Sequence, residues 1–451
     1  MTITIAKRGS KANLLIKDAR VFDPERGVDM RADVAVERGQ ISSIAPVGKG
    51  RSPHRGDAPE ATDSGASGAE IIEAAGRLLV PGFVDLHTHL RTPGREDEED
   101  LTSGTAAAAA GGYVTICAMP NTEPVVDNAS VLSSLIERAE AEASVSVAFL
   151  GAISRGQEGI RLADIWDMAE AGAVAFSDDG RPVTDGGLLR AAFQAAKLVG
   201  LPLVLHCEDS DLAATGVMNE SEVSARLGLA GIPCSAESAA AARDLEIAAY
   251  EDARVHIAHV SCVRTLGHIR RAREGGVTVT CEVTPHHLTL SDEEVFSLDA
   301  NLKMNPPLRS EADRQALVEA LAAGDMDCIA TDHAPHAPQE KETPFEEAAF
   351  GTLGLETAFP VLYTRLVESG GVPLERLVAA MSTGPARAVG LPEPALEEGE
   401  EANLALIDTE EEFDIEPARF QSKSRNSAFS GQKAKGKVKL TVAAGRVAYR
   451  L

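Results

Sequence analysis

Short apolar runs alternate with longer amphipathic stretches through the middle of the chain. Runs rich in Val, Ile, Phe and Leu predict strands at residues 82–88, 113–118, 145–150, 173–177, 201–206, 254–259, 277–283 and 327–331. Stretches with helical periodicity separate them, for example at 128–143, 188–199, 236–249 and 311–323. Eight alternating units predict an α/β fold, with a closed parallel (β/α)8 barrel of the TIM type rather than an open sheet.

The two ends of the chain have a different hydrophobic pattern, with short strand-like runs and no helical periodicity. These runs lie at 13–16, 33–36 and 40–44 near the start, and at 403–407, 438–442 and 445–449 near the end. Neither end is long enough to bury a good core alone, so we expect the two to pair into one small β-sandwich domain. The predicted organisation is residues 1–80 and 386–451 for this small domain and residues 81–385 for the barrel.

Residues 48–68 interrupt the first β segment. They consist largely of Gly, Ser, Pro, Asp and Ala, and they carry no apolar periodicity. This composition is typical of a flexible surface insertion, and the sequence gives it no function.

Composition narrows the functional classes. A formal net charge of -26 over 451 residues disfavours a nucleic-acid partner, because the phosphate backbone would be repelled. Six cysteines lie far apart without a Cys-x-x-Cys pair, which suits buried thiols in a reducing compartment. The first residues lack an apolar segment of signal-peptide length, and no apolar run is long enough to span a bilayer. We therefore expect a cytoplasmic protein with no membrane partner.

The strongest candidate for chemistry is His87-Thr88-His89, at the end of the first predicted barrel strand. Side chains two residues apart in a strand point to the same face, so both imidazoles can bind one ion. Two histidines are only half a site for a cation such as zinc, which usually takes further N, O or S ligands.

Further His and Asp residues follow later predicted strands. They are Asp178 and Asp179 after the fourth strand, His206 after the fifth, His259 after the sixth and Asp332 after the eighth. Taken singly, such a residue is more often a hydrogen-bonded loop residue. Because catalytic groups of a (β/α)8 barrel lie at the C-terminal ends of its strands, their shared position predicts one metal site.

The segment around the two histidines, PGFVDLHTHLRTPG at residues 81–94, resembles the signature of the cyclic amidohydrolases. Further motifs resemble the longer-chain bacterial dihydroorotases within that group, and the resemblance runs in order from about residue 12 to the C-terminus. These motifs are Met119-Pro120-Asn121-Thr122, His206-Cys207-Glu208, Ala258-His259-Val260-Ser261, Glu282-Val283-Thr284-Pro285-His286-His287, Lys303-Met304-Asn305-Pro306-Pro307-Leu308-Arg309 and Thr331-Asp332-His333-Ala334-Pro335-His336.

One position separates the relatives. Hydantoinases and shorter dihydroorotases resemble one another in placing a carboxylated lysine after strand 4, whereas this chain has Ser177-Asp178-Asp179-Gly180 there. The resemblance to the longer-chain dihydroorotases implies that an Asp bridges two metal ions instead. Family spacing to His206 favours Asp179 over Asp178, although spacing alone does not decide between them.

The resemblance implies a zinc enzyme that interconverts N-carbamoyl-L-aspartate and L-dihydroorotate, the ring-closing step of pyrimidine (UMP) synthesis. It implies two zinc ions with a nucleophilic hydroxide between them. Asp332 would take a proton from that hydroxide and pass it to the leaving ring nitrogen. The first ion would be held by His87, His89, Asp179 and Asp332, and the second by Asp179, His206 and His259.

A carboxylate-bearing substrate needs a cation in its pocket, and Arg91 can bind a carboxylate through two parallel hydrogen bonds. By resemblance, the substrate contacts also include His89, Asn121, Asn305, His336 and the backbone of Phe350 and Gly351. The residues alone leave alternatives open: a surface pair of Arg91 with Glu96 or Asp97, a turn role for Asn121 and a plain loop histidine at position 336.

Four more histidines fall near predicted strand ends. We expect His286, His287 and His333 either to support the metal ligands or to have structural roles, rather than to bind metal, since six ligands already fill two sites. His256 could face the barrel interior and is left out of the metal set.

Two other functions stay open at this point. The chain could be another cyclic amidohydrolase, such as a hydantoinase or allantoinase, although the missing lysine and the presence of Arg91 disfavour this. It could also be a catalytically silent scaffold for aspartate transcarbamoylase, although all six ligands are present. We expect the protein to form a homodimer. An active enzyme could still form a complex with aspartate transcarbamoylase.

Overall fold

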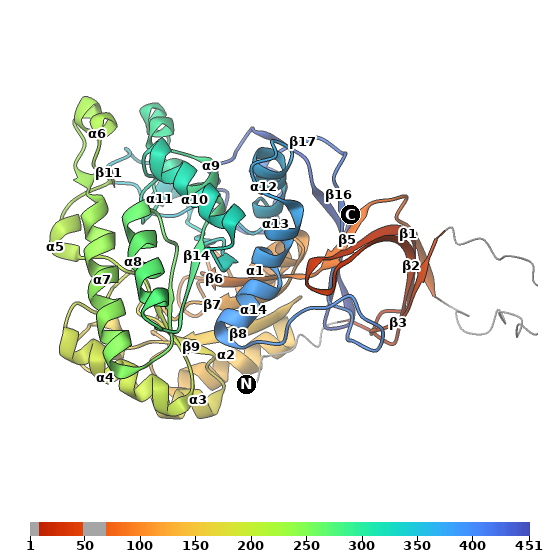
Figure 1. Ribbon diagram of the computed structural model, residues 1–451, viewed down its shortest axis with the longest axis horizontal. Coiled ribbons are helices and arrows are strands. Elements are labelled where there is room, and N and C mark those ends of the chain that lie inside the picture. Colours follow the sequence, from red (N-terminus) through yellow and green to blue (C-terminus); the bar gives the residue numbers. More distant parts are fainter. Residues whose placement is uncertain (1–8, 48–68) are drawn as a thin grey trace, which may run out of the picture.

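The computed structural model describes residues 9–47 and 69–451. Figure 1 shows a large unit in which helices surround a set of strands, with a smaller sheet beside it. The insertion predicted at residues 48–68 lies outside the described residues. In the described part, no helix is long and apolar enough to cross a membrane.

The large unit is an eight-stranded parallel sheet in the order β6-β7-β8-β9-β10-β13-β14-β15. Its strands are β6 (Phe83–Thr88), β7 (Tyr113–Ala118), β8 (Ser146–Gly151), β9 (Ala175–Phe176), β10 (Leu203–Leu205), β13 (Val255–Ile257), β14 (Val279–Val283) and β15 (Cys328–Ile329). The helices between and after them are α1 (Leu101–Ala110), α2 (Ala129–Glu142), α3 (Ile165–Ala171), α4 (Gly186–Val199), α7 (Cys234–Glu251), α8 (Val263–Glu274), α10 (Glu311–Ala323), α13 (Leu374–Met381) and α14 (Thr383–Val389). This alternation confirms the predicted (β/α)8 barrel.

Shorter elements lie in the connections. They are α5 (Ser210–Ala213), β11 (Met218–Asn219), α6 (Glu222–Leu227), β12 (Gly231–Ile232), α9 (Pro285–Thr289), α11 (Pro338–Lys341), α12 (Ala358–Leu362), β17 (Phe413–Asp414) and β18 (Lys433–Ala434). Strands β11 and β12 pair with each other, as do β17 and β18.

The barrel closes between its first and last strands through side chains as well as backbone. The amide of His89 donates to the carbonyl of His333 at 2.9 Å. The buried carboxylate of Asp85 on β6 accepts the amide and the hydroxyl of Thr331 at 3.1 and 2.6 Å. Strand β15 ends at Ile329, earlier than predicted, and Asp332 follows three residues later with a φ of +48°.

The small sheet contains strands from both ends of the chain, as predicted. Its order is β20-β19-β16-β5-β1-β2-β3, with β4 also paired to β1. The strands are β1 (Leu14–Asp23), β2 (Val28–Glu37), β3 (Gln40–Pro46), β4 (Glu70–Glu73), β5 (Leu78–Pro81), β16 (Leu404–Asp408), β19 (Lys437–Ala443) and β20 (Arg446–Arg450). They are hydrogen-bonded as one continuous sheet, in which β5 joins the two ends by pairing with β1 and β16. Strand β6 begins two residues after β5, so the small sheet leads directly into the barrel strand that carries His87.

Candidate metal centre and active site

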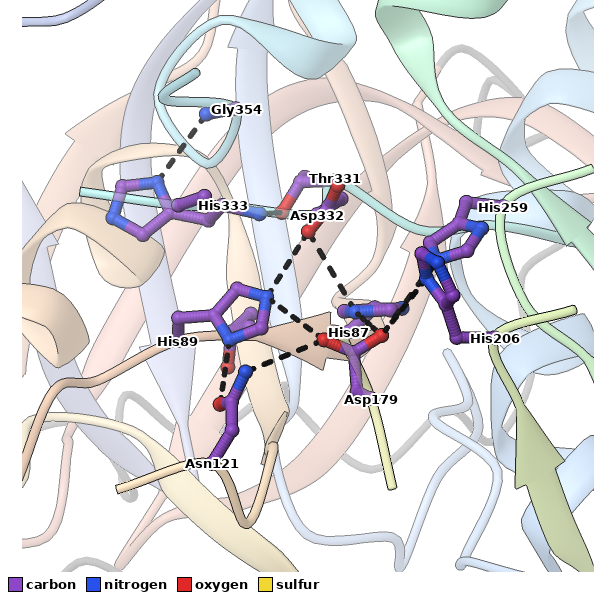
Figure 2. A network of polar contacts seen from close by, with 12 residues as sticks. His87, His89, Asn121, Asp179, His206, His259, Thr331, Asp332, His333 and Gly354 are labelled. Atoms are coloured by element: carbon purple, nitrogen blue, oxygen red, sulfur yellow. Dashed lines mark hydrogen bonds and ion pairs between the residues drawn. The ribbon is translucent and has the colours of Figure 1, made fainter. Parts of the chain in front are cut away.

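Six side chains meet at the C-terminal ends of the barrel strands, where Figure 2 shows them pointing toward one another. All are buried, with at most 8% of each residue exposed. His87 lies in β6 and His89 follows it, and the others follow β9, β10, β13 and β15. They are His87, His89, Asp179, His206, His259 and Asp332.

Their ligand atoms form two overlapping groups that share Asp179. His87, His89 and Asp179 form one group, and Asp179, His206 and His259 form the other, with the ligand atoms of each group within 4.8 Å of one another. Asp179 Oδ1 lies 3.3 Å from His87 Nε2 and 3.6 Å from both His206 Nδ1 and His259 Nε2. Two atoms that bind one tetrahedral zinc ion lie about 3.4 Å apart, so these spacings fit metal coordination.

Asp332 adds a second carboxylate to the first group. Its Oδ1 atom lies 3.1 Å from His89 Nε2 and 3.6 Å from His87 Nε2. It is therefore placed where it could complete a four-ligand set with His87, His89 and Asp179.

Unpartnered atoms in the cluster support metal binding. His87 Nε2 and Asp179 Oδ1 are buried and have no hydrogen-bond partner among the described residues. Burial of polar atoms without partners is costly, and a divalent cation between them would remove that cost. Burial lowers the pKa of His87, but the charges of Asp179 and Asp332 raise it well above its usual value. The two carboxylates thus favour positive charge at this position, which a metal ion bound to Nε2 of the neutral ring would supply.

The structure separates the two adjacent aspartates that the sequence left open. Asp178 accepts the backbone amides of Ile153 and Ser154 at 2.8 and 3.1 Å and the hydroxyl of Ser154. Asp179 instead points into the histidine cluster. Asp178 therefore fixes the loop after β9, and Asp179 is the candidate ligand.

Hydrogen bonds orient both histidines of the His-x-His motif. His87 Nδ1 lies 2.9 Å from Glu282 Oε1, and His89 Nδ1 lies 3.0 Å from Asn121 Oδ1. Since these oxygens only accept, each Nδ1 carries the proton, and each Nε2 presents its lone pair to the cluster. Asn121 also donates to Asp179 Oδ2 at 3.4 Å, so it orients two candidate ligands.

Three site residues have left-handed backbone conformations that are rare outside glycine. Arg91, His259 and Asp332 have φ values of +56°, +31° and +48°. Each such residue costs on the order of 1–3 kcal/mol and persists only where its surroundings impose it. Their concentration here is typical of a functional site.

A cavity of about 220 Å³ lies against the cluster and is lined by all the predicted substrate contacts. His87 is fully buried and is not part of its lining. The lining residues are His89, Arg91, Asn121, Asp179, Gly180, His206, His259, Asn305, Asp332, Ala334, His336, Phe350 and Gly351.

Arg91 is a pocket residue whose acidic neighbour is Glu98, so it forms no pair with Glu96 or Asp97. Its Nε atom donates to the carbonyl of Pro335 at 3.0 Å and lies 3.0 Å from Glu98 Oε2. Its Nη2 atom lies 3.4 Å from His336 Nε2. The guanidinium and the imidazole therefore lie side by side in the cavity wall.

His336 and Asn305 are held by their neighbours. His336 Nε2 lies 2.8 Å from the carbonyl of Phe350, and Nδ1 lies 3.2 Å from Glu340 Oε2. Asn305 donates to Glu208 at 2.9 Å, while its own Oδ1 is buried without a partner. His336 is thus more than a loop histidine, and Asn305 retains a free acceptor.

Three residues that support this site had no role assigned to them from the sequence. Glu98 lies beside Arg91, and Glu282 orients His87. Asn426, from the C-terminal segment, accepts the amide of His336 at 3.1 Å and donates to the carbonyls of Ala334 and Gly351 at 2.9 and 3.2 Å. Glu282 opens one of the family motifs and is an acidic residue at the end of a predicted core strand, which is a signal for a role, whereas no local signal marks Asn426.

The histidines left out of the metal set make other contacts. His287 lies between the Thr284 hydroxyl and the carbonyl of Pro306, at 2.8 and 3.0 Å. His333 accepts the amide of Gly354 at 3.3 Å, as Figure 2 shows. His286 Nε2 is buried without a hydrogen-bond partner among the described residues.

Comparisons with known proteins agree with this geometry. Residues 76–264 match the family model described as dihydro-orotase-like. The dihydroorotase of Geobacter sp. (strain M21) is 44% identical over 438 residues, covering 97% of this chain and 99% of the relative. The dihydroorotase of Pelotomaculum thermopropionicum is 45% identical over 434 residues, covering 96% and 98%.

Solved structures extend the likeness to other enzymes of the same fold. The L-hydantoinase (dihydropyrimidinase) of Arthrobacter aurescens superimposes with a TM-score of 0.84 at 26% identity, covering 97% of this chain and 96% of that one. A dihydropyrimidinase of Brevibacillus agri gives a TM-score of 0.81 at 23% identity, over 97% and 95% of the two chains. At that lower identity the likeness concerns the fold alone.

Proposed function

The chain belongs to the dihydroorotase family of cyclic amidohydrolases, and we propose that it is a zinc enzyme that reversibly closes N-carbamoyl-L-aspartate to L-dihydroorotate. The observation that carries the proposal is the cavity in which a buried arginine lies beside a metal-binding cluster. A cyclic amide with a carboxylate substituent needs both features. In this role the protein would perform the ring-closing step of pyrimidine synthesis.

We assign two metal ions to the cluster, and imidazole with carboxylate is a ligand set that suits zinc. Bound metal ions lower the pKa of water from about 16 to near 7 and polarise a carbonyl oxygen. Asp179 belongs to both ligand sets. His87, His89, Asp179 and Asp332 would hold one ion, and Asp179, His206 and His259 the other.

Asp332 is the proposed general acid and base. Burial raises its pKa, but the positive charge of His87 and a hydrogen bond with His89 lower it below the usual value, so the carboxylate is ionised. Its Oδ1 faces His89 Nε2, which leaves Oδ2 to accept a proton during ring opening and return it to the ring nitrogen. Such proton transfer accounts for roughly 100-fold to 10,000-fold in rate.

Arg91, His336 and Asn121 are the proposed ligands of the substrate carboxylate. Because Arg91 Nε is engaged by Pro335, its terminal nitrogens stay available for two parallel bonds to a carboxylate. Burial and a hydrogen bond to Glu340 raise the pKa of Glu98, so this neighbour tends to keep its proton and does not cancel the charge of Arg91. The charge needed to bind an anion is therefore preserved.

Asn305 and the backbone of Phe350 and Gly351 are the proposed contacts of the ring. The buried Oδ1 of Asn305 lacks a partner, so it can accept from a ring N–H. The carbonyls of Phe350 and Gly351 are already hydrogen-bonded by His336 and by Asn426 and Lys341, which leaves the loop little freedom to move.

A comparison of substrates tests this function. Purified zinc-loaded protein should open L-dihydroorotate, and it should leave hydantoin and dihydrouracil unchanged because they lack the carboxylate that Arg91 binds. Hydantoinase activity is the second candidate, favoured by the likeness to the Arthrobacter aurescens enzyme. Opening of hydantoin with dihydroorotate left intact would replace the first proposal with the second.

We also propose a cytoplasmic homodimer that can associate with aspartate transcarbamoylase. The free state of all six cysteines supports a reducing compartment. The mass of the protein by light scattering, alone and mixed with a purified aspartate transcarbamoylase, tests both assembly proposals.

A further inference from the structure

A column of polar side chains runs through the barrel interior, starting beneath the metal-binding cluster. Glu282 Oε1 lies 2.9 Å from His87 Nδ1, and Glu282 Oε2 lies 3.1 Å from His256 Nε2. His256 Nδ1 lies 2.8 Å from the hydroxyl of Thr280. His256 and Thr280 are directly opposite each other on β13 and β14, and Glu282 is two residues farther along β14.

The column occupies positions that barrels usually fill with apolar residues. The alternate residues of β14, namely Val279, Cys281 and Val283, pack into the outer core, so Thr280 and Glu282 point inward. Glu282 and His256 are 0% exposed. Apolar branched side chains dominate such interiors, and a buried carboxylate is costly unless its hydrogen bonds are complete. The polar side chains of this column therefore indicate a role other than packing.

The protons of the column fit only one arrangement when both histidines are neutral. Glu282 is acceptor-only when ionised, so His87 donates from Nδ1 and His256 donates from Nε2. His256 Nδ1 then carries a lone pair, which the Thr280 hydroxyl satisfies as donor.

Glu282 also contacts the segment after β13, which contributes His259 to the other metal group. Its Oε1 atom accepts the backbone amide of His259 at 3.3 Å, where the chain has the strained φ of +31°. One carboxylate thus fixes the ring of His87 and the backbone of His259. His256 is the donor that holds the second oxygen of this carboxylate.

We propose that His256 is a positioning residue of the metal centre, which acts through Glu282 to hold His87 and His259 in the orientation that binds metal, with Thr280 fixing His256 in turn. This inference rests on the proposed metal site, and it adds a group that touches neither metal nor substrate. The effect should be larger at the ion held by His87, whose ring is oriented directly, than at the ion held by His259.

The far end of the column can be changed without touching the substrate cavity. Thr280 is partly exposed and lines a separate cavity of about 310 Å³, together with Leu321 and Met326, near the N-terminal ends of β14 and β15. Replacement of Thr280 by the isosteric valine removes the donor to His256 and leaves the walls of the active site intact. This substitution therefore tests whether Thr280 helps to position His256, without a change in the active site.

The experiment compares zinc release from the holoenzyme to a chromophoric chelator, together with kcat and KM for L-dihydroorotate. His256→Leu should speed release of one zinc ion by about 10- to 100-fold and lower kcat, while KM stays within about twofold because Arg91 and His336 are untouched. His256→Gln, whose side-chain amide can still donate to Glu282, should stay within about threefold of wild type. Thr280→Val should lie between them.

His287→Leu is the matched control, since His287 is also buried between a threonine hydroxyl and a second acceptor but contacts no candidate ligand. It should release zinc at the wild-type rate. Folded His256→Leu with wild-type zinc release and kcat would overturn the inference. If His256→Leu does not fold, Thr280→Val provides the test, and zinc release from that variant at the wild-type rate would also overturn the inference. A wild-type protein that binds no zinc or turns over no dihydroorotate would instead refute the proposed function.

Discussion

Arg91→Lys separates substrate binding from metal chemistry in this active site. The arginine side chain is 12% exposed, and its Nε atom is fixed by the carbonyl of Pro335 at 3.0 Å. That anchor directs the terminal nitrogens toward the cavity they share with His336. Lysine keeps the positive charge, but it offers a single ammonium and has no second nitrogen that could remain on Pro335.

The expected loss follows from the hydrogen bonds involved. A hydrogen bond to a charged group contributes about 1.5–3 kcal/mol, and each 1.36 kcal/mol corresponds to a factor of ten in rate. Loss of one such bond to the substrate carboxylate should lower kcat/KM by about 10- to 150-fold. Since the carboxylate is remote from the scissile amide, most of this loss should appear in KM.

Initial rates of L-dihydroorotate opening over a range of substrate concentrations give kcat and KM, and elemental analysis gives zinc per chain. Zinc should stay at the wild-type level, because Arg91 is no candidate ligand. Arg138→Lys is the control, since Arg138 is partly exposed on α2 and pairs with Glu96 and Glu142. Unchanged kcat/KM in Arg91→Lys would refute the role of the guanidinium in binding the carboxylate.

Three further predictions concern the ligands and the buried carboxyls. Asp332→Asn can still bind metal through its amide oxygen but cannot carry a proton, so turnover in both directions should fall by roughly 100-fold to 10,000-fold with zinc retained, and near-normal rates would exclude Asp332 as the base. His259→Ala should lower zinc content and activity together, and full occupancy with normal turnover would contradict its assignment as a ligand. Burial raises the pKa of Glu356 from 4.5 to about 7, so the folded carboxyl binds its proton more tightly than the unfolded one, and stability should fall as pH rises from about 4.5 to 7. Glu356→Gln should remove that decline in stability, which amounts to a loss on the order of 1–3 kcal/mol at pH 8. If the Tm of the variant and that of wild type fall in parallel across this pH range, Glu356 is not the cause of the decline.

The parts of the site that the sequence could predict depend on local periodicity. His87, His206 and His259 each end an apolar run of strand length, and the barrel brings all such ends to one face. That rule alone predicted that the candidate side chains share one face of the barrel. The choice between Asp178 and Asp179 did not, because it depends on which carboxylate reaches the amides of Ile153 and Ser154.

Other parts of the site depend on contacts between distant segments. Glu98 lies beside Arg91 only because the loop before α1 folds back into the cavity wall, and Asn426 comes from a segment 90 residues beyond His336. Asn121 proved to orient His89 and Asp179, where the sequence pointed only to a carboxylate contact. Such roles depend on tertiary packing between distant segments, which cannot be read from a short stretch of sequence.

Zinc dependence of dihydroorotate turnover tests the central claim most directly. Protein stripped of metal by a chelator is titrated with zinc while ring opening of L-dihydroorotate is followed, with metal content measured at each point. Activity should be absent from the stripped protein and should rise with bound zinc, up to about two ions per chain. Full turnover in stripped protein, or zinc bound at the cluster without any turnover of dihydroorotate, would contradict the claim that this cluster drives the ring chemistry.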